Sequence, residues 1–304
     1  MEQMWIEQLA KAVGEENLLV NEPMSRHTTF RIGGLADVLI TPCDETALAD
    51  AIRICREHGT AYTLIGNGSN LLVSDQGYRG VVMEIGRNMS RIEVEGRCMK
   101  AQAGALLISL ARQAKEHALT GLEFASGIPG TLGGGVIMNA GAYGGEMKDV
   151  IRSVRVMNND LEIFEVSGEE MDFGYRTSRA QKEGWIILGA GLELAQGDEE
   201  AITARMNELK QQRVTKQPLD FPSAGSTFKR PEGYFAGKLI MDAGLKGYRV
   251  GDAMVSEKHA GFVVNAGQAT AAQVHQLMTD VTRIVEEKYG VTLEPEVKRL
   301  GDFV

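Results

Sequence analysis

Apolar residues recur at a helical spacing in several stretches of this 304-residue chain. Between residues 45 and 57 four apolar side chains share one helical face, and Gly59 beyond them is suited to end the helix. Thr270 and Gln273 form a capping box at the start of the longest such stretch. The pattern predicts helices at residues 1–7, 45–57, 106–117, 236–243 and 270–289, and a charged helix that begins at 196–200 and runs to 213.

Short apolar runs between these stretches have the length and composition of strands. They predict strands at residues 36–40, 61–65, 81–85, 91–94, 99–103, 153–157, 161–166, 185–194, 261–265 and 291–297. The length predicts two domains, since about 150 residues is a usual domain size. Composition shifts near residues 196–200, so we predict an α+β chain with domains at 1–200 and 201–304, the last strand being able to return to the first domain.

Composition and charge narrow the function classes. No apolar run approaches the ~20 residues of a membrane span, and the first residues lack the pattern of a secretory signal. The three widely spaced cysteines favour a reducing compartment, so we expect a cytoplasmic protein. Five histidines without ligand-like spacing predict no metal site, and a net charge of −9 disfavours nucleic acid or an anionic membrane as partner.

Glycine is concentrated in two places. Residues 126–145 contain eight glycines in twenty positions, where average usage of about 7% would give one or two. A shorter stretch, Gly66 to Asn70, follows an apolar run and therefore lies where a strand ends in a tight turn. Successive backbone N–H groups in such a turn suit a diphosphate. Together the stretches predict a phosphate-bearing cofactor across a glycine-lined cleft, although each alone is also typical of an ordinary turn.

Six motifs in a fixed order resemble the UDP-N-acetylenolpyruvoylglucosamine reductase family, over residues 20 to 300. They are Pro23–Gly34, Gly66–Asn70, Ser126–Thr131, Tyr175–Arg179, Ala224–Phe228 and Leu293–Val297. The resemblance implies a two-lobed FAD-binding domain of the vanillyl-alcohol-oxidase (PCMH) type and a smaller α+β substrate-binding domain. The short chain resembles the type II variant, which lacks a loop that carries a substrate-capping tyrosine.

The resemblance also implies the cofactor contacts. The turn would embrace the pyrophosphate of FAD, and the longer glycine-rich stretch would line the flavin and its ribityl chain. The residues concerned are Gly66, Asn67, Gly68, Ser69 and Asn70 in the turn, and Ser126, Gly127, Gly130, Thr131, Gly133 and Gly135, with Asn139, Ala140 and Gly141 at the ring edge. Any one glycine of the second set is equally explained as a turn or packing residue.

Three residues are implied in catalysis. In the family, hydride from NADPH passes through FAD to C3 of an enolpyruvyl group, and the negative charge at C2 and its carboxylate is then held and protonated. Arg176 matches the residue that holds the carboxylate, because a guanidinium fork meets it with two hydrogen bonds. Ser226 matches the proton donor. Glu294 and Glu296 alternate about Pro295 on one face of an extended segment, and only the resemblance selects Glu296.

Further residues are candidates for binding the substrate, a UDP-sugar. They are Tyr175, Lys216, Lys229, Arg230 and His259. The resulting hypothesis is a monomeric, cytoplasmic FAD- and NADPH-dependent reductase that makes UDP-N-acetylmuramate for peptidoglycan. Two alternatives stay open: a flavin oxidase of the same cofactor-domain type, and a non-catalytic sensor of flavin or nucleotide-sugar. The turn at Gly66 carries no histidine for a covalent flavin link, which counts against the oxidase.

Overall fold

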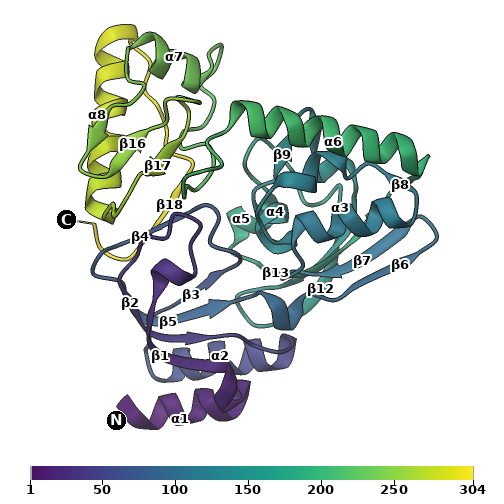
Figure 1. The fold of residues 1–304 in the computed structure, drawn as a ribbon. Helices are drawn as coiled ribbons and strands as arrows, with labels where there is room; N and C mark the ends of the chain where they lie inside the picture. Colours follow the sequence, from purple (N-terminus) through teal and green to yellow (C-terminus); the bar gives the residue numbers. More distant parts are fainter. Residues whose placement is uncertain (1, 304) are drawn as a thin grey trace. The chain divides into compact units, whose positions relative to one another are not determined.

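The computed structural model describes residues 2–303, which divide into two compact units built from several chain segments each (Figure 1). The first unit comprises the chain up to Leu18, Ile40–Asn67 and Met83–Gln212. The second comprises Leu19–Leu39, Gly68–Val82 and the chain from Arg213 onward. Both units are therefore discontinuous in sequence, and the division predicted near residue 200, which concerns function rather than compactness, stays a prediction.

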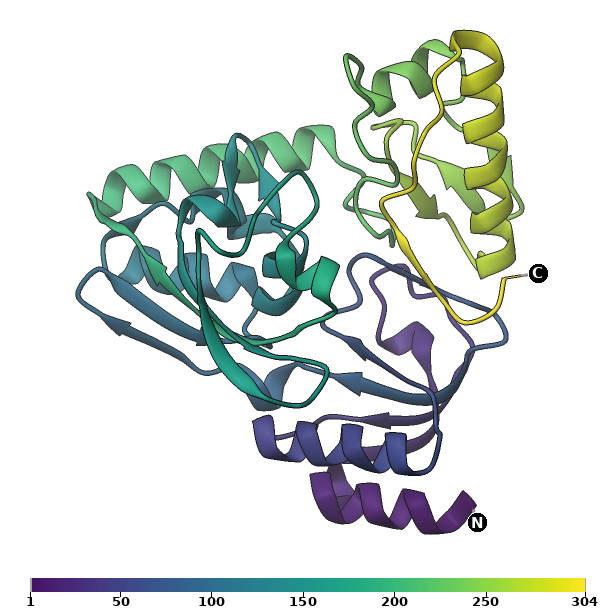
Figure 2. The same ribbon diagram turned by 180° about the vertical axis from the view of Figure 1, so that it is seen from behind.

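A five-stranded antiparallel sheet forms the centre of the first unit, in the order β12-β11-β13-β7-β6. Helices α3 and α4 lie over one face of it, as Figures 1 and 2 show from opposite sides. The strands of the first unit are β3 (Tyr62–Ile65), β6 (Ile92–Glu95), β7 (Cys98–Gln102), β8 (Leu119–Thr120), β9 (Gly141–Ala142), β10 (Gly145–Glu146), β11 (Ile151–Met157), β12 (Ile163–Ser167), β13 (Ile186–Glu193) and β14 (Ala195–Gln196).

Helix α2 of the first unit begins and ends at recognisable caps. Asp44 accepts a hydrogen bond from the Ala47 amide at the start of α2, and Gly59 follows its end with φ +63°. The α-helices are α1 (Glu2–Val13), α2 (Glu45–Glu57), α3 (Leu107–Glu116), α4 (Leu132–Ile137), α5 (Arg179–Glu183) and α6 (Glu199–Lys216), which continues into the second unit. Short 3₁₀ helices are η1 (Glu15–Asn17), η3 (Arg87–Met89), η4 (Glu123–Gly127) and η5 (Met147–Asp149).

The second unit packs α7 and α8 with a small antiparallel sheet, β15-β16-β17. Its core joins Phe30 and Ile32 to Phe228, Leu293 and the apolar face of α8, all of them buried. Its elements are β1 (Leu18–Pro23), η2 (Met24–Arg26), β2 (Leu35–Ile40), β4 (Leu71–Val73), β5 (Tyr78–Glu84), α7 (Ala236–Asp242), β15 (Arg249–Val250), β16 (Ala253–Val255), β17 (Val263–Asn265), α8 (Ala271–Tyr289) and β18 (Lys298–Leu300). The capping box predicted at Thr270 and Gln273 is confirmed.

The predicted strand at 291–297 is wrong, because the regular strand β18 begins only at Lys298 and pairs in parallel with β4. Residues 291–297 form only an isolated bridge, between Pro295 and Phe228. The two hydrogen bonds of this bridge join the Glu294 carbonyl to the Lys229 amide and the Glu296 amide to the Thr227 carbonyl, and the pairing does not extend into a regular strand. The apolar run was a correct sign of burial at Leu293 and Val297 but not of a strand.

Candidate functional site

The turn between β3 and β4 can be formed only with glycine at two positions. Gly68 has φ +57°, and a Cβ there would overlap the carbonyl oxygen of His27. A Cβ on Gly66 would overlap the hydroxyl of Thr131. The backbone therefore folds tightly, and a left-handed residue in such a turn is one way to build a nest of amides that binds phosphate.

The two glycine-rich stretches lie side by side in the first unit. The Asn67 side chain donates a hydrogen bond of 2.6 Å to the carbonyl of Pro129, and Gly66 abuts Thr131. This bond uses one of the two N–H groups of the Asn67 side chain and leaves the second for another acceptor. The adjacency is the arrangement expected of two stretches that line one cofactor.

Some of the predicted flavin-lining residues have a sufficient structural explanation of their own. Gly133 and Gly135 pack against Ala103 and Leu107, where an added Cβ would come within 3.1 Å of existing atoms. The Gly133 amide is already bonded to the Ala103 carbonyl at 2.8 Å. The flavin contacts predicted for this stretch stay predictions; the other residues concerned are Ser126 and Gly127 in η4, Gly130 after it, Thr131 at the N-cap of α4, and Ala140 and Gly141 beyond that helix.

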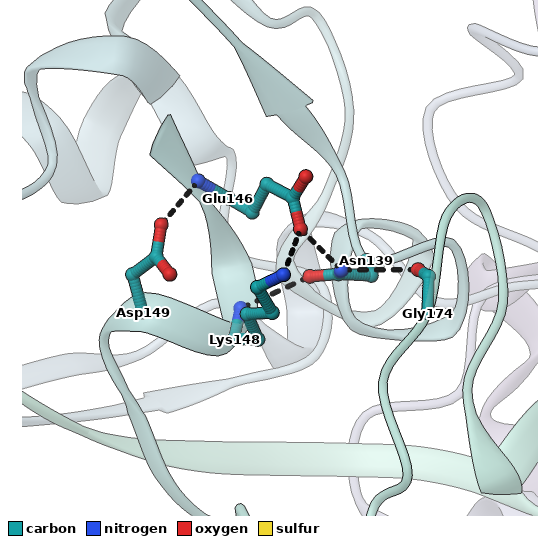
Figure 3. A network of polar contacts seen from close by, with 5 residues as sticks. All are labelled: Asn139, Glu146, Lys148, Asp149 and Gly174. Atoms are coloured by element: carbon teal, nitrogen blue, oxygen red, sulfur yellow. Dashed lines mark hydrogen bonds and ion pairs between the residues drawn. The ribbon is translucent and has the colours of Figure 1, made fainter. Parts of the chain in front are cut away.

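Asn139 is buried, with 1% of its surface exposed, and its side chain is fully used by the protein (Figure 3). Its Nδ2 donates to Glu146 Oε2 at 2.9 Å and to the Gly174 carbonyl at 3.1 Å, while its Oδ1 accepts from the Lys148 amide at 3.0 Å. A contact with the flavin edge would therefore have to use its backbone. Sequence reasoning missed this side-chain role.

Tyr175 and Arg176 are the two central residues of a tight turn in the first unit. Gly174 and Thr177 exchange backbone hydrogen bonds of 3.1 and 3.4 Å across its base. Arg176 has φ +55°, a left-handed conformation that is costly for a residue with a side chain. Its guanidinium carbon lies 5.3 Å from the centroid of the Tyr175 ring, which is itself 54% exposed. Non-glycine residues in such conformations cluster at functional sites.

Ser226 and Glu296 are joined in the second unit through the residue between them in space, Thr227. The Thr227 carbonyl accepts from the Glu296 amide at 2.8 Å, and its own amide donates to the Gly261 carbonyl at 2.8 Å. Thr227 has none of its surface exposed, and its hydroxyl accepts from the Val263 amide at 2.9 Å. The neighbouring Ser226 is exposed. Thr227 thus fixes the backbone directly after the candidate proton donor, another role that sequence reasoning missed.

The turn residue Asn70 also contacts the Glu296 segment. Its side chain donates to the Glu296 carbonyl at 3.2 Å, and its own carbonyl accepts from the Lys298 amide at 2.9 Å. Both contacts lie within the second unit, to which Gly68, Ser69 and Asn70 belong. Part of the predicted pyrophosphate turn is therefore attached directly to the segment that carries the candidate acid.

The two carboxylates left open by the sequence differ in their surroundings. Glu294 forms an ion pair with Lys229 and is mostly exposed, whereas Glu296 is half-buried. The Glu294 carboxylate is therefore already used, and Lys229 with it, unless a ligand displaces the pair. The resemblance alone selects Glu296, and its role stays a prediction.

The remaining substrate candidates lie in the second unit. The Arg230 guanidinium carbon lies 4.6 Å from the centroid of the Phe235 ring, and Lys216 is exposed at the end of α6. His259 Nδ1 accepts from the Gly261 amide at 3.1 Å, and burial lowers the pKa of its ring. His259 is therefore neutral at pH 7, with Nε2 as its N–H donor.

The structure thus brings Ser226, Glu296 and Asn70 together in the second unit and holds Arg176 in a separate, strained turn of the first. Convergence of Arg176 with the other two stays a prediction. Within residues 2–303 no group of histidine, cysteine and acidic side chains has the arrangement of a metal site. None of the helices in that range is long and apolar enough to cross a membrane.

Comparison with known proteins matches two stretches of the chain to known domain families. Residues 36–167 match the FAD binding domain, and residues 217–300 match the UDP-N-acetylenolpyruvoylglucosamine reductase C-terminal domain. The chain is 51% identical to UDP-N-acetylenolpyruvoylglucosamine reductase of Lachnoclostridium phytofermentans, over all of this chain and 99% of the relative. It is 50% identical to the enzyme of that name from Caldanaerobacter subterraneus, over 99% of this chain and all of the relative.

A solved structure agrees. The crystal structure of UDP-N-acetylenolpyruvylglucosamine reductase from Thermus caldophilus superposes with a TM-score of 0.79 at 36% identity, covering 93% of this chain and 98% of that one. Fold and matches together define an oxidoreductase with a PCMH-type FAD-binding domain and a separate C-terminal domain. The chain belongs to the UDP-N-acetylenolpyruvoylglucosamine reductase family.

Proposed function

We propose that this chain reduces UDP-N-acetylglucosamine enolpyruvate to UDP-N-acetylmuramate for peptidoglycan synthesis, with NADPH as the electron donor. Beyond family membership, the proposal is supported by the hydrogen bonds of Thr227 to Glu296, Gly261 and Val263, which we call the Thr227 clamp. It holds an exposed serine hydroxyl and a half-buried carboxylate, Ser226 and Glu296, on directly bonded backbone segments. A proton donor and a carboxylate fixed together are what protonation of a carbon centre requires.

FAD, when bound, supplies the hydride that passes from NADPH to the substrate. The turn at Gly66 to Asn70 fits its pyrophosphate, because Gly68 is left-handed and neither Gly66 nor Gly68 leaves room for a side chain. Ser126, Gly127, Gly130 and Thr131 are proposed to line the flavin beside this turn.

Residues of the chain would then stabilise the negative charge that develops on the substrate and protonate C2. Hydride addition at C3 of the enolpyruvyl group leaves an electron pair shared by C2 and its carboxylate. Arg176 binds that carboxylate with two hydrogen bonds and stabilises the charge. Ser226 donates its hydroxyl proton to C2, and Glu296 orients the substrate carboxylate and the serine. Tyr175, Lys216, Arg230 and His259 are proposed as contacts to the nucleotide-sugar.

The two half-reactions provide the test. Anaerobic NADPH should bleach the flavin absorbance near 450 nm, which is a general property of this cofactor, and the enolpyruvyl substrate should restore it. Ser226→Ala should leave bleaching unchanged and slow the recovery by about 10²–10⁴-fold, the usual contribution of a general acid. Ser223→Ala is the matched control, because Ser223 lies on the same segment and accepts a hydrogen bond of 2.7 Å from the Thr29 hydroxyl through its backbone carbonyl.

Equal losses in both half-reactions of Ser226→Ala would remove Ser226 from this role. Rapid recovery with oxygen but not with the enolpyruvyl substrate would favour the oxidase, and bound flavin with neither recovery would favour a sensor. The proposal includes a cytoplasmic monomer, in keeping with three free thiols in the described chain. Sedimentation at micromolar concentration tests the monomer directly.

A further inference from the structure

The Asn139 side chain has one defined orientation, set by its partners. Glu146 can only accept hydrogen bonds through its carboxylate, and the Lys148 amide can only donate one. The Asn139 amide nitrogen must therefore face Glu146 and Gly174, and its oxygen must face Lys148 (Figure 3). Because Asn139 is buried, none of these bonds has water as a ready replacement.

Asn139 occupies this position because it ends helix α4. It lies just after the C-cap residue Met138 with φ +41°, a conformation that asparagine tolerates better than most residues. Glu146 reaches it from strand β10 and covers Gly141 so closely that an added Cβ would lie 2.8 Å from Glu146 Cγ. The glycine at 141 thus makes room for the carboxylate that orients Asn139.

What Asn139 holds is the base of the turn that carries Arg176. Its Nδ2 bonds the Gly174 carbonyl, one residue before Tyr175. On the other side of the turn, the Ser178 hydroxyl donates to the Ile137 carbonyl at 2.9 Å. Both flanks of the turn are therefore attached to the last residues of α4.

The turn needs such attachment, because Arg176 is left-handed. A non-glycine residue in this conformation is strained and persists only where its surroundings impose it. Glu146 is also electrically coupled to the turn. Its pKa is lowered chiefly by the hydrogen bond from Lys148; burial opposes this, and the hydrogen bond from Asn139 and the charges of Lys148 and, least, Arg176 lower the pKa further.

We propose that Asn139, oriented by Glu146, is a positioning residue that fixes where the Arg176 guanidinium meets the substrate carboxylate. The inference rests on the proposed function, in which Arg176 stabilises the charge on the enolpyruvyl group. Asn139 does not touch the substrate in this account. Its effect passes through the Gly174 carbonyl to the turn.

The test compares Asn139→Gly with wild type in the two half-reactions. Glycine removes the side chain and tolerates φ +41° without added strain. Flavin reduction by NADPH should stay within about threefold, and reoxidation by the enolpyruvyl substrate should slow by about 10–100-fold, the scale expected when a catalytic group moves by about 1 Å. Equal slowing of both steps would overturn the inference and assign Asn139 to the flavin or to general stability.

Asn158→Gly is a matched control. The Asn158 amide also donates to a glutamate, Glu162 at 3.0 Å, and its oxygen also accepts from backbone amides, but at a surface turn between β11 and β12. It should leave both steps unchanged. Glu146→Ala and Glu146→Gln are the second pair, used also where Asn139→Gly folds poorly. Glu146→Gln keeps an acceptor for Asn139, so it should slow reoxidation less than Glu146→Ala does. A larger effect of Glu146→Gln would contradict the proposal.

A double-mutant cycle with Arg176→Ala separates positioning from mere stability. If Asn139 acts through Arg176, adding Asn139→Gly to Arg176→Ala slows flavin reoxidation by less than about a further threefold, because both changes remove the same interaction. If Asn139→Gly slows reoxidation as much in the Arg176→Ala background as in wild type, the inference is overturned. If Arg176→Ala reoxidises slowly but Asn139→Gly reoxidises at the wild-type rate, the inference fails and the proposed function stands. If Arg176→Ala reoxidises normally, the proposed role of Arg176 fails, and the inference with it.

Discussion

The clamp at Thr227 predicts a specific loss on replacing threonine by valine. Thr227→Val keeps the shape of the side chain but removes the oxygen that accepts from the Val263 amide at 2.9 Å. Thr227 is completely buried, so the freed amide has no water to bond. An unsatisfied buried donor costs about 1–3 kcal/mol, which at roughly 2–4 °C per kcal/mol lowers Tm by about 2–12 °C.

Hydrogen exchange gives the more direct assay. In wild type the Val263 amide should exchange slowly, and in Thr227→Val the peptide that contains it should exchange faster while peptides from helix α2 stay unchanged. Thr227→Ser is the control, because it keeps the hydroxyl and loses only a methyl group, at a cost of about 1 kcal/mol. The serine variant should therefore retain protection at Val263.

Two results would refute this reasoning. One is equal exchange at Val263 in the valine and serine variants, which would mean that the hydroxyl does not bond the amide in solution. The other is an unchanged Tm in Thr227→Val, which would mean that the site relaxes without cost.

Three further predictions concern other parts of the chain. Asp75→Ala should destabilise the second unit by about 0.5–2 kcal/mol, measured by thermal unfolding, because the carboxylate accepts from the first two amides of α8 at 2.8 and 2.9 Å; an unchanged Tm would contradict it. Burial raises the pKa of the Cys55 thiol to about 11, so a thiol reagent at pH 8 should label the two exposed cysteines of the native protein, and Cys55 only after unfolding; three fast thiols would be the contrary result. The pKa of Glu146 lies below its ordinary 4.5, so its ionised form stabilises the fold at pH 4.5 and above. The difference in unfolding free energy between wild type and Glu146→Gln should therefore shrink as pH falls below 4.5. A difference independent of pH would count against the ion pair with Lys148.

The sequence was informative wherever structure depends on neighbours along the chain. Helix α2 was predicted with its observed limits, and α8 within one residue, because caps and apolar spacing are local. The strand expected at 291–297 is wrong because pairing depends on a distant partner: the bridge between Pro295 and Phe228 does not extend into a strand, and β18 pairs with β4 instead. Burial was predictable there, but the hydrogen-bonding partner was not.

The candidate site shows the same limit. The glycine turn could be predicted, because glycine adopts the left-handed backbone of Gly68 at the least cost. The roles of Asn139 and Thr227 were not visible, because their partners are backbone groups that only the fold brings near. The ion pair between Glu294 and Lys229 was likewise not visible in the sequence, because the two residues are far apart along the chain.

The contact between Asn70 and Glu296 has a consequence for how the enzyme is made. The two residues are 226 positions apart, so the ribosome must complete nearly the whole chain before they can meet. Contacts of such long range form slowly, because the entropy of closing the intervening loop is lost first. The nascent protein therefore passes through synthesis without this pairing, and premature termination at any codon before Glu296 leaves a product that can never acquire it.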